Sequence, residues 1–417
     1  MEIRELYNIY QKNPSICTDT RRITKGSLFF ALKGKNFNGN EFAQQAIKEG
    51  CSFAIIDEGD ASDTQFILVR NVLETLQKLA RYHRKRISIP VIGITGTNGK
   101  TTSKELTHHI LESELNCYAT KGNLNNAIGV PLSILEISSK HDIAIIEMGA
   151  NHEKEIDFLC NIARPTHGVI TNIGTAHLEG FKDPEGIIRA KNELYKFIKN
   201  NKSTLFINND DYLLVELATN INQICYGINS ELDVSIEDNS KFLNVKWGGI
   251  IIRSKMIGDY QFYNISLAIC ISNYFNVSKR NIQRSIESYI PKNNRSEIIE
   301  TSSNIIILDA YNANPSSMKA MLDSFAKQKH KNKLCILGDM LELGDYSKEE
   351  HADIIKKCEK LELECILVGD EFGKVSTENF KNTSDLKKFI KENPIEEKTI
   401  LLKGSRGICL EDLVHVL

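Results

Sequence analysis

The stretch GITGTNGKTT, residues 93–102, contains residue types that bind phosphate. Its part from Gly96 to Thr102 follows VIGIT, a short apolar run typical of a buried parallel strand, and opens a predicted helix. Backbone N–H groups in such a turn, with the helix dipole behind them, form a cradle for an anion. The spacing differs from the usual G-x-x-x-x-G-K-[ST] pattern, because the glycines lie three apart, at Gly93, Gly96 and Gly99. A tight turn without a ligand is the plainer alternative, but G-K-T-T at the helix start favours phosphate binding.

Side chains in and near this loop could act on a nucleotide and a metal ion. Lys100 would reach the β- and γ-phosphates, and the Thr101 hydroxyl would ligate Mg²⁺. Glu147 ends a second predicted strand, and His177 follows a third, in TNIGTAHLEGF. Alone, Glu147 fits a solvated charge or a helix cap, and His177 fits an ordinary partnered histidine. Together at adjacent strand ends, where open parallel sheets bind ligands, they predict a site for a metal carried by a nucleotide.

Strands that alternate with helices must position these residues, which predicts an α/β protein with parallel sheets. Residues 1–83 alternate short apolar runs with polar turns and predict a small mixed α/β domain. Residues 84–296 predict a central domain with strands in VIGIT, DIAIIEMG, HGVITNIG and STLFINND, irregular strands over 225–257 and a buried helix over 264–275. The alternation restarts in residues 297–417, where NIIILDAY, KLCILGDM, ECILVGD and TILLKGS predict a second doubly wound, Rossmann-like unit.

The composition excludes several classes of protein. The chain has 417 residues and a net charge of −2, so no global basic field indicates a nucleic acid or an anionic membrane as partner. Its ten cysteines show no C-x-x-C spacing, which indicates a reducing compartment. No apolar run is long enough for a signal core or a membrane span, so we expect a cytoplasmic protein without membrane insertion. We interpret the one dense basic cluster, over 81–86, as a solvated helix end at a domain boundary.

GITGTNGKTTSKE resembles the ATP loop of the Mur ligases and folylpolyglutamate synthases, in which the glycines also lie three apart. Nearly the whole chain is similar to the Mur ligase branch that joins D-alanyl-D-alanine to UDP-N-acetylmuramoyl-tripeptide. The segments that carry this similarity are GNLNNAIGVPLSIL (122–135), IIEMGANHEKEI (145–156), AYNANPSSM (310–318) and LGDMLELGDYSKEEH (337–351). Y-N-A-N-P discriminates best, because sister ligases tend to have an A-H-x-P type of segment there.

The resemblance implies three domains: an N-terminal one for the UDP substrate, a central one for ATP and a C-terminal Rossmann-like one. It implies that Thr101, Glu147 and His177 ligate magnesium and that Lys191, in RAKNELYKF, is the lysine that sister ligases carry as a carbamate. The implied catalytic residues are therefore Lys100, Glu147, His177 and Lys191. The implied ATP contacts are Gly96, Thr97, Asn98, Gly99, Lys100, Thr101, Thr102, Asn209, Arg295 and Asp309.

Substrate contacts are implied in all three domains. CTDTRRITKGSLFFALKGKNFNG (17–39) resembles the uridine-nucleotide segment, with Asp19, Thr20 and Arg21 at its D-S-R motif. The other implied contacts are Asn123, Asn125, Asn126, Tyr311, Asn312, Asn314 and Lys403.

The chain departs from the family pattern at three places. Thr20 replaces Ser, Asn294 replaces Gly before Arg295, and GDYQFYN (258–264) lacks the usual G-x-H-N start. Asn tolerates positive φ, so the turn at Asn294 can form.

Several of these residues also have an ordinary structural interpretation. Asn314–Pro315 fits a helix start, with Asn at the N-cap and Pro at N1. Lys191 taken alone fits an exposed helix lysine. Lys403 and Arg406 fit simple pairs with surface carboxylates.

The resemblance implies an ATP-dependent amide ligase of peptidoglycan synthesis, and hence a role in cell-wall biogenesis, cell shape and cell division, acting as a monomer. Another Mur ligase or a folylpolyglutamate synthase is the nearest alternative. A nucleotide-regulated switch that hydrolyses ATP without ligation is the alternative from another class. Both would keep the glycine loop, but neither explains the 17–39 segment together with YNANP.

Overall fold

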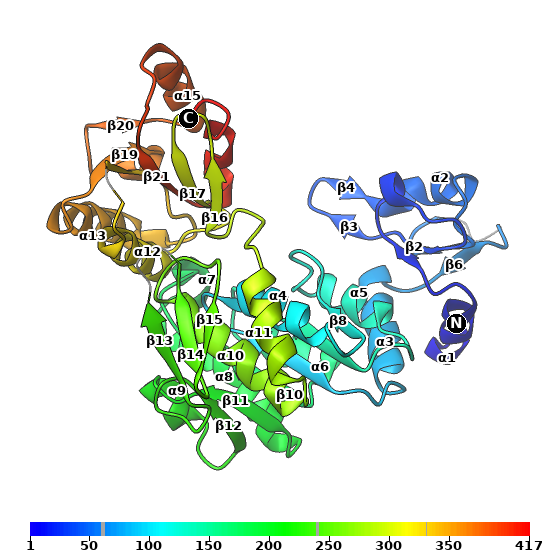
Figure 1. The fold of residues 1–417 in the computed structure, drawn as a ribbon. Helices are drawn as coiled ribbons and strands as arrows, with labels where there is room; N and C mark the ends of the chain where they lie inside the picture. The colour runs from blue at the N-terminus through cyan, green and yellow to red at the C-terminus, as the bar shows by residue number, and fades with distance from the viewer. Residues whose placement is uncertain (60–62, 239–241, 331) are drawn as a thin grey trace.

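The computed structural model describes residues 1–59, 63–238, 242–330 and 332–417. Three larger β-sheets follow one another along the chain, and Figure 1 shows the N-terminal and C-terminal ones on different sides of the central one. The fold class predicted from the sequence, α/β with parallel sheets, is confirmed. Among the described residues, no helix is both long and apolar enough to cross a bilayer.

The N-terminal sheet has four parallel strands in the order β1-β2-β5-β6. Their bounds are β1 (Ile16–Cys17), β2 (Leu28–Phe30), β5 (Phe53–Ile56) and β6 (Phe66–Leu68). The hairpin β3 (Lys33–Gly34)–β4 (Phe37–Asn38), the 3-10 turns η1 (Thr20–Arg22) and η2 (Gly39–Phe42) and helix α2 (Ala43–Lys48) complete this region. Phe30, Ala54 and Ile55 are fully buried, which gives this small sheet a core of its own.

Helices α1 (Ile3–Lys12) and α3 (Val72–Arg84) lie between the N-terminal sheet and the central helices α5 (Gly129–Glu136) and α6 (Glu155–Ala163). The interpretation of 81–86 as a solvated helix end is wrong for two residues, because His83 and Arg84 are buried. Arg84 donates hydrogen bonds to the carbonyls of Ala163 (2.8 Å) and Arg164 (3.1 Å). Carbonyls at a helix C-terminus lack partners within the helix, so a buried guanidinium can satisfy them.

The central sheet has six parallel strands in the order β12-β11-β10-β7-β9-β8. Their bounds are β7 (Val91–Thr95), β8 (Cys117–Ala119), β9 (Ile143–Glu147), β10 (His167–Ile170), β11 (Thr204–Asn208) and β12 (Asn222–Tyr226). Alternate strand residues face two helical layers: Ile92 and Ile94 share a core with Leu106 and Ile265, whereas Val91 faces the other core. This two-sided burial explains why the strands are almost continuously apolar.

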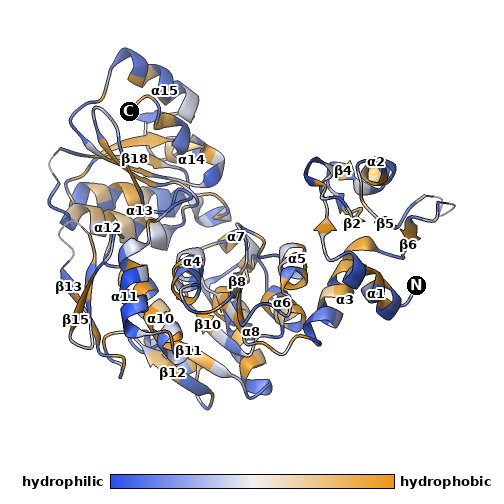
Figure 2. Ribbon diagram, turned by 45° about the vertical axis from the view of Figure 1, so that its right-hand side comes forward, coloured by the Kyte–Doolittle hydropathy of each residue, from blue (hydrophilic) through white to orange (hydrophobic). Residues whose placement is uncertain are grey.

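One helical layer consists of α4 (Lys100–Leu111), α10 (Gln261–Tyr274) and α11 (Lys279–Ser288), and the other includes α5, α6 and α8 (Pro184–Asn200). Figure 2 shows α11 as largely hydrophilic on the outside of its layer. The short helices α7 (Leu178–Phe181) and α9 (Tyr212–Leu217) follow strands β10 and β11. An antiparallel sheet of β13 (Val234–Asp238), β14 (Asn244–Trp247) and β15 (Ile250–Arg253) confirms the irregular strands expected over 225–257.

The C-terminal sheet has the order β16-β17-β21-β18-β19-β20, and only the edge strand β16 is antiparallel to its neighbour. The strands are β16 (Glu297–Glu300), β17 (Ile305–Asp309), β18 (Lys333–Gly338), β19 (Glu364–Val368), β20 (Asn379–Phe380) and β21 (Thr399–Lys403). The helices are α12 (Pro315–Lys327), α13 (Ser347–Lys360), α14 (Asp370–Gly373) and α15 (Thr383–Glu392), with the turns η3 (Gly344–Tyr346), η4 (Arg406–Ile408) and η5 (Leu410–Leu413). Helices α12 and α13 cover one face, and α15 with η5 covers the other, as the second doubly wound unit requires.

Candidate active site

The glycine loop leaves strand β7 and leads directly into helix α4. Gly96 (φ +144°) and Gly99 (φ +79°) adopt backbone conformations that side chains disfavour. A Cβ at Gly96 would lie 1.9 Å from Thr171 Oγ1, and one at Gly99 would lie 2.6 Å from Asn264 Oδ1. Glycine is therefore required at both positions by backbone conformation and by space.

The loop is held from the end of strand β10. Thr97 donates through its hydroxyl to the carbonyl of Gly174 (3.0 Å), and the N–H of Asn98 donates to Asn172 Oδ1 (3.0 Å). The Thr171 hydroxyl donates to the carbonyl of Asn98 (2.6 Å). In contrast, the N–H groups of Lys100, Thr101 and Thr102 donate to no described residue. The loop thus has a fixed shape and presents unpaired donors at a helix N-terminus, which is what phosphate binding requires.

Lys100 bends back over its own loop. Its ammonium donates to the carbonyls of Gly96 (2.7 Å) and Thr97 (3.0 Å). Burial lowers the pKa of Lys100, and the nearby Glu147 carboxylate acts in the opposite direction. A bound phosphate would offer this ammonium a charged acceptor in place of two neutral carbonyls.

Glu147, at the end of β9, is 2% exposed and has one partnered and one unpartnered oxygen. Its Oε1 accepts hydrogen bonds from the Thr101 hydroxyl (3.2 Å) and the Asn125 amide (2.9 Å). Its Oε2 accepts no hydrogen bond from a described residue, and Lys104 Nζ lies 3.6 Å away. A buried carboxylate oxygen without a hydrogen bond, next to a threonine hydroxyl, fits Mg²⁺, which prefers oxygen ligands.

His177 follows β10 at the start of α7 and has a left-handed backbone (φ +52°). Its Nδ1 contacts the carboxylate of Glu342, which lies in the C-terminal part of the chain. The described residues contain no ready-made cluster of three His, Cys, Asp or Glu side chains for a metal. A metal bound by Glu147 and His177 would therefore need the Thr101 hydroxyl, phosphate oxygens or a modified side chain to complete its shell.

Lys191 lies in helix α8 and is 3% exposed, which contradicts the interpretation as an ordinary exposed helix lysine. Its ammonium forms no hydrogen bond or ion pair with a described residue and lies 5.8 Å from the centre of the Phe181 ring. Burial, and next the charge of Lys100, lower the pKa of Lys191 to about 7. A substantial share of the Lys191 side chain is therefore a neutral amine near neutral pH. The neutral amine is the form that reacts with CO₂.

The C-terminal part contributes a second set of charges. Lys403 donates to Asp309 Oδ2 (2.5 Å), and the two residues are register partners on β21 and β17. This pair lies at the site, so the alternative of a simple surface pair is wrong for Lys403. The Arg295 guanidinium lies 3.8 Å from the centre of the Tyr311 ring, and its Nε is buried and donates to no described residue. Arg295 therefore keeps a donor for a ligand.

One cavity of about 840 Å³ joins these groups. It is lined by eighteen of the predicted site residues: Thr97, Asn98, Gly99, Lys100, Thr101, Thr102, Asn123, Asn125, Asn126, Glu147, His177, Lys191, Arg295, Asp309, Tyr311, Asn312, Asn314 and Lys403. A larger hollow of about 920 Å³, between α1, α3 and α5, is lined by none of them. The sequence predictions thus converge on one place in the fold.

Mur ligase family models match most of the chain. The Mur ligase middle domain matches residues 94–272, the Mur ligase glutamate ligase domain matches 294–406, and the Mur ligase family catalytic domain matches 14–90. The UDP-N-acetylmuramoyl-tripeptide–D-alanyl-D-alanine ligase of Bacillus subtilis is 31% identical, over 96% of this chain and 92% of its own length. The chain belongs to the Mur ligase family. The ligase of the same name from Synechocystis is 33% identical over 97% of this chain and 91% of its own.

Solved Mur ligase structures share the fold over nearly the full length. MurF from Acinetobacter baumannii has a TM-score of 0.87 and 30% identity, over 98% of this chain and 97% of that one. The MurF ligase of Thermotoga maritima in complex with ADP has a TM-score of 0.85 and 25% identity, over 97% of both chains. A folylpolyglutamate synthase of Mycobacterium tuberculosis, at 13% identity and a TM-score of 0.63, shares only the fold.

Some predicted residues of this Mur ligase lie outside the cavity. Gly96 lies directly before it in the loop. Asn209 donates through its amide to the carbonyl of Asn229, and its neighbours Asn208 and Asp210 line a second cavity of about 580 Å³. Asn172, Tyr260 and Asn264 line both cavities.

Thr20 and Arg21 lie in η1 and Asp19 is its N-cap, beside the N-terminal sheet and away from both cavities. The Arg21 side chain is exposed and pairs with Asp19 at 2.8 Å, and the Asp19 carboxylate accepts the N–H of Arg21. These hydrogen bonds lower the pKa of Asp19 to about 2. Asp19 and Arg21 therefore form an ion pair on the surface beside the N-terminal sheet.

Sequence reasoning missed several residues at the site. Gln261 is buried and accepts the Asn264 amide (2.6 Å), while Asn264 accepts the Ser103 hydroxyl (2.9 Å). The divergent segment 258–264 thus lines the cavity, and its remaining Asn264 was the available signal. Ser316 lies in AYNANPSSM and Glu342 in LGDMLELGDYSKEEH. Their contacts with Asn98 and His177 join distant segments of the chain, so the sequence alone does not reveal them.

Proposed function

We propose that this Mur ligase uses ATP to join D-alanyl-D-alanine to UDP-N-acetylmuramoyl-tripeptide, giving the UDP-N-acetylmuramoyl-pentapeptide precursor of peptidoglycan. The observation that carries the proposal is the single cavity in which the glycine loop faces Tyr311, Asn312 and Asn314 of the YNANP segment. The relatives named above support the choice of substrates within the family.

The phosphate end of the reaction belongs to the glycine loop. Unpaired N–H groups at the start of α4 and the Lys100 ammonium face the position of the β- and γ-phosphates. Arg295 and Lys403 line the same cavity and add positive charge to it. Donors fixed before the substrate arrives stabilise developing charge without reorganisation, which is the largest contribution in many phosphoryl and acyl transfers.

Magnesium is the metal that the residues fit. Thr101, Glu147 and His177 would bind it, and Lys191 would join them as an anionic ligand if it carries a carbamate. When bound, Mg²⁺ supplies charge neutralisation at the phosphate oxygens. Carbamylation would turn Lys191 from a cation that repels the metal into an anion that attracts it.

The chemistry divides into two displacements. A carboxylate oxygen of the tripeptide attacks the γ-phosphorus, ADP leaves, and an acyl phosphate forms. The free amine of D-alanyl-D-alanine then attacks the acyl carbon, the bond to phosphate breaks, and the amine gives up a proton. The protein contributes positioning: in this proposal Asn123, Asn125 and Asn126 hold the tripeptide, and the YNANP segment holds the dipeptide.

The acyl phosphate must be kept from water. Asn314 and Ser316, at the start of α12, bond to Asn98 in the glycine loop, so the C-terminal part covers the phosphate site. Coverage by a separate part of the chain allows substrates to enter and then excludes water.

The proposal includes several finer points. The chain divides into a UDP-substrate domain (1–83), an ATP domain (84–296) and a C-terminal Rossmann-like domain (297–417), and Asp19, Thr20 and Arg21 bind the uridine nucleotide. Asn209 contacts ATP near the second cavity. The enzyme acts as a monomer in the cytoplasm, and its product serves cell-wall biogenesis, cell shape and cell division.

Phosphate release by the purified chain tests the function. With Mg²⁺ and ATP, we expect rapid release only when UDP-N-acetylmuramoyl-tripeptide and D-alanyl-D-alanine are both present, and mass spectrometry should find the pentapeptide product. Tripeptides with lysine or diaminopimelate at the third position should be compared. L-alanyl-L-alanine, the UDP-dipeptide and a folate serve as controls. ATP hydrolysis that ignores both substrates would indicate a nucleotide switch, and turnover of the folate would indicate the sister activity.

A further inference from the structure

A short segment of the C-terminal part, residues 339–346, reaches onto helix α7 of the central part. We call it the connector. The carbonyl of Glu342 accepts the N–H of Glu179 (3.3 Å), and a Cβ at Gly344 would lie 3.5 Å from the Glu179 Cα. The connector therefore rests directly against the helix that begins after His177.

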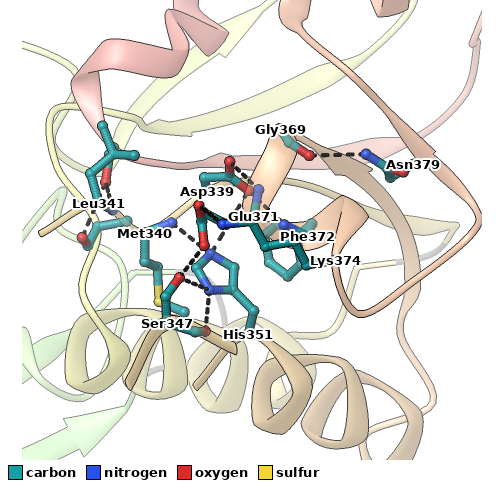
Figure 3. A network of polar contacts seen from close by, with 12 residues as sticks. Asp339, Met340, Leu341, Ser347, His351, Gly369, Glu371, Phe372, Lys374 and Asn379 are labelled. Carbon is teal, nitrogen blue, oxygen red and sulfur yellow. Dashed lines mark hydrogen bonds and ion pairs between the residues drawn. The ribbon is translucent and has the colours of Figure 1, made fainter. Parts of the chain in front are cut away.

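The base of the connector is fixed by a buried polar network (Figure 3). Asp339 accepts the N–H groups of Glu371 and Phe372, both at 2.9 Å. The N–H of Met340 donates to His351 Nε2 (3.0 Å), while His351 Nδ1 donates to the carbonyl of Ser347 (2.7 Å). Since Asp339 and His351 are almost fully buried, these bonds hold the start of the connector rigidly to helices α13 and α14 of the C-terminal part.

Leu341, the residue before the tip of the connector at Glu342, is also held by hydrogen bonds. The N–H of Leu341 donates to Ser405 Oγ (3.0 Å), and that hydroxyl donates to the carbonyl of Ala313 (3.3 Å), next to the N-cap of α12. The connector and the YNANP segment are thus tied to each other within the C-terminal part.

At the tip, Glu342 meets His177. Both residues have left-handed backbones, with φ of +63° and +52°, although neither is glycine. This conformation is unfavourable for residues with a Cβ and persists only where surrounding structure enforces it. Two such residues face each other across the boundary between two parts of the chain, and the Glu342 carboxylate contacts His177 Nδ1.

This contact decides which ring nitrogen of His177 is available. A carboxylate on Nδ1 favours the proton there, which leaves a lone pair on Nε2. Nε2 forms no hydrogen bond with a described residue, and His177 lines the cavity with Glu147 and Lys191. A second partner that fixes the tautomer and orientation of a metal-binding histidine is a general feature of metal sites.

We propose that Glu342 is a positioning residue that sets the tautomer and orientation of His177 for Mg²⁺, so that the metal site is complete only when the connector rests on α7. The inference relies on the proposed assignment of His177 to the metal. It gives the C-terminal part a role in metal binding although it supplies no ligand itself.

The first test needs neither metal nor turnover. NMR of the full chain labelled with ¹⁵N-histidine reports the tautomer of each imidazole, and His177→Ala identifies the resonance of His177. We expect the Nδ1–H tautomer in the wild type and a shift toward Nε2–H in Glu342→Ala. Glu342→Gln, whose amide oxygen can still accept from Nδ1, should stay close to the wild type. Asp345→Asn, an exposed acid on the same connector, is the matched control. An unchanged tautomer in Glu342→Ala would overturn the inference.

The second test measures Mn²⁺ binding, as a spectroscopic substitute for Mg²⁺, to the full chain with ADP. Loss of a residue that orients a metal ligand typically weakens metal binding 10- to 100-fold, so we expect the Kd for Mn²⁺ to rise about tenfold or more in Glu342→Ala and little in Asp345→Asn. Should Glu342→Ala fold poorly, the wild-type tautomer still decides, because an Nε2–H tautomer of His177 in the wild type would overturn the inference. If His177→Ala weakens Mn²⁺ binding and Glu342→Ala does not, the inference about Glu342 is wrong, but the assignment of His177 to the metal stands. If His177→Ala has no effect on Mn²⁺ binding, both the inference about Glu342 and the assignment of His177 to the metal are wrong. The ligase activity is judged separately, by product formation.

Discussion

Asn314 donates its side-chain amide to the side-chain oxygen of Asn98 at 2.8 Å, which joins the start of helix α12 to the glycine loop. Asn98 in turn donates to the Ser316 hydroxyl (3.0 Å), so the two segments exchange hydrogen bonds in both directions. The same Asn314 caps α12 by accepting the N–H of Ser317 (2.9 Å). One residue thus both starts a helix and fixes the phosphate loop against the C-terminal part.

These two roles of Asn314 can be separated by Asn314→Ser. Serine caps helices about as well as asparagine but is too short to reach Asn98, so the free energy of unfolding should change by less than about 1 kcal/mol. We expect kcat/KM to fall about fivefold, because a hydrogen bond is worth about 1 kcal/mol and the loop loses its partner. Chemical denaturation and steady-state kinetics measure the two quantities.

Asn382→Ala is the control for the loss of a cap. Asn382 caps α15 by accepting the N–H of Asp385 and lies outside the cavity. Its removal should cost about 1 kcal/mol of stability and leave kcat/KM unchanged. Wild-type kcat/KM in Asn314→Ser would show that the contact with Asn98 is irrelevant to turnover.

Lys100→Ala should abolish turnover and leave the fold intact. Among the described residues, the Lys100 ammonium bonds only to carbonyls of its own loop, so its loss removes little structural support. Loss of a charged contact to the transferred phosphate should reduce kcat by two or more orders of magnitude. Phosphate release and the thermal midpoint are the measurements, with the exposed Lys292→Ala as control. Near-normal turnover would place the catalytic nucleotide elsewhere.

Glu147→Gln should raise the magnesium concentration needed for half-maximal activity. The amide oxygen can still accept from Thr101 and Asn125, so the site keeps its shape while losing the charge that attracts the cation. Glu105→Gln is the matched control, because Glu105 also pairs with Lys104 but does not line the cavity. Equal magnesium titrations for both variants would mean that the metal is bound elsewhere. His177→Ala should behave like Glu147→Gln.

The sequence predicted those features that local pattern determines. Apolar runs such as VIGIT and TILLK became buried parallel strands, and Gly96 and Gly99 of the loop occupy positive-φ positions that only glycine occupies easily. Asn314–Pro315 began a helix, as the N-cap and N1 preferences predict. Most of the site residues that were predicted from motif resemblance line one cavity.

Features that depend on distant parts of the chain could not be predicted. Arg84 lies in a basic cluster that is typical of a solvated helix end, but it is buried against the end of helix α6. Nothing near Arg84 in the sequence indicates this burial. The burial of Lys191 depends on how α8 packs behind the glycine loop. The contact between His177 and Glu342 joins residues in separate parts of the fold, so neither neighbourhood reveals it.

The burial of Lys191 predicts how stability depends on pH. With a pKa of about 7 in the folded chain and an ordinary value of 10.5, the unfolded state binds more protons between those two pH values. Stability therefore rises with pH from about 7 to 10.5, while below 7 the full cost of burying a charge applies. Lys191→Met removes this cost, so the variant should be more stable at pH 6.5, by an amount on the order of a few kcal/mol.

The stability gap between Lys191→Met and the wild type should narrow as the pH approaches 10. Urea unfolding in CO₂-free buffer, which keeps the amine unmodified, measures it at each pH. Lys196→Met, on the exposed face of the same helix, should show no such gap. A variant no more stable than the wild type at pH 6.5 would mean that burial does not lower the pKa of Lys191.

Lys191 should be carbamylated in the active enzyme and should act as an anion. The reaction of CO₂ with a lysine needs the neutral amine, which a pKa of about 7 supplies at pH 8. Depletion of CO₂ should therefore lower activity, and bicarbonate labelled with ¹³C should give a carbamate NMR signal that Lys191→Ala lacks. Lys191→Ala should be severely impaired and should recover partly with a short carboxylic acid, which can occupy the vacated anionic position. Lys196→Ala should need no rescue. An ordinary phosphate-binding lysine predicts the opposite pattern, because small amines would then restore activity and acids would not; that result would show the carbamate assignment to be wrong.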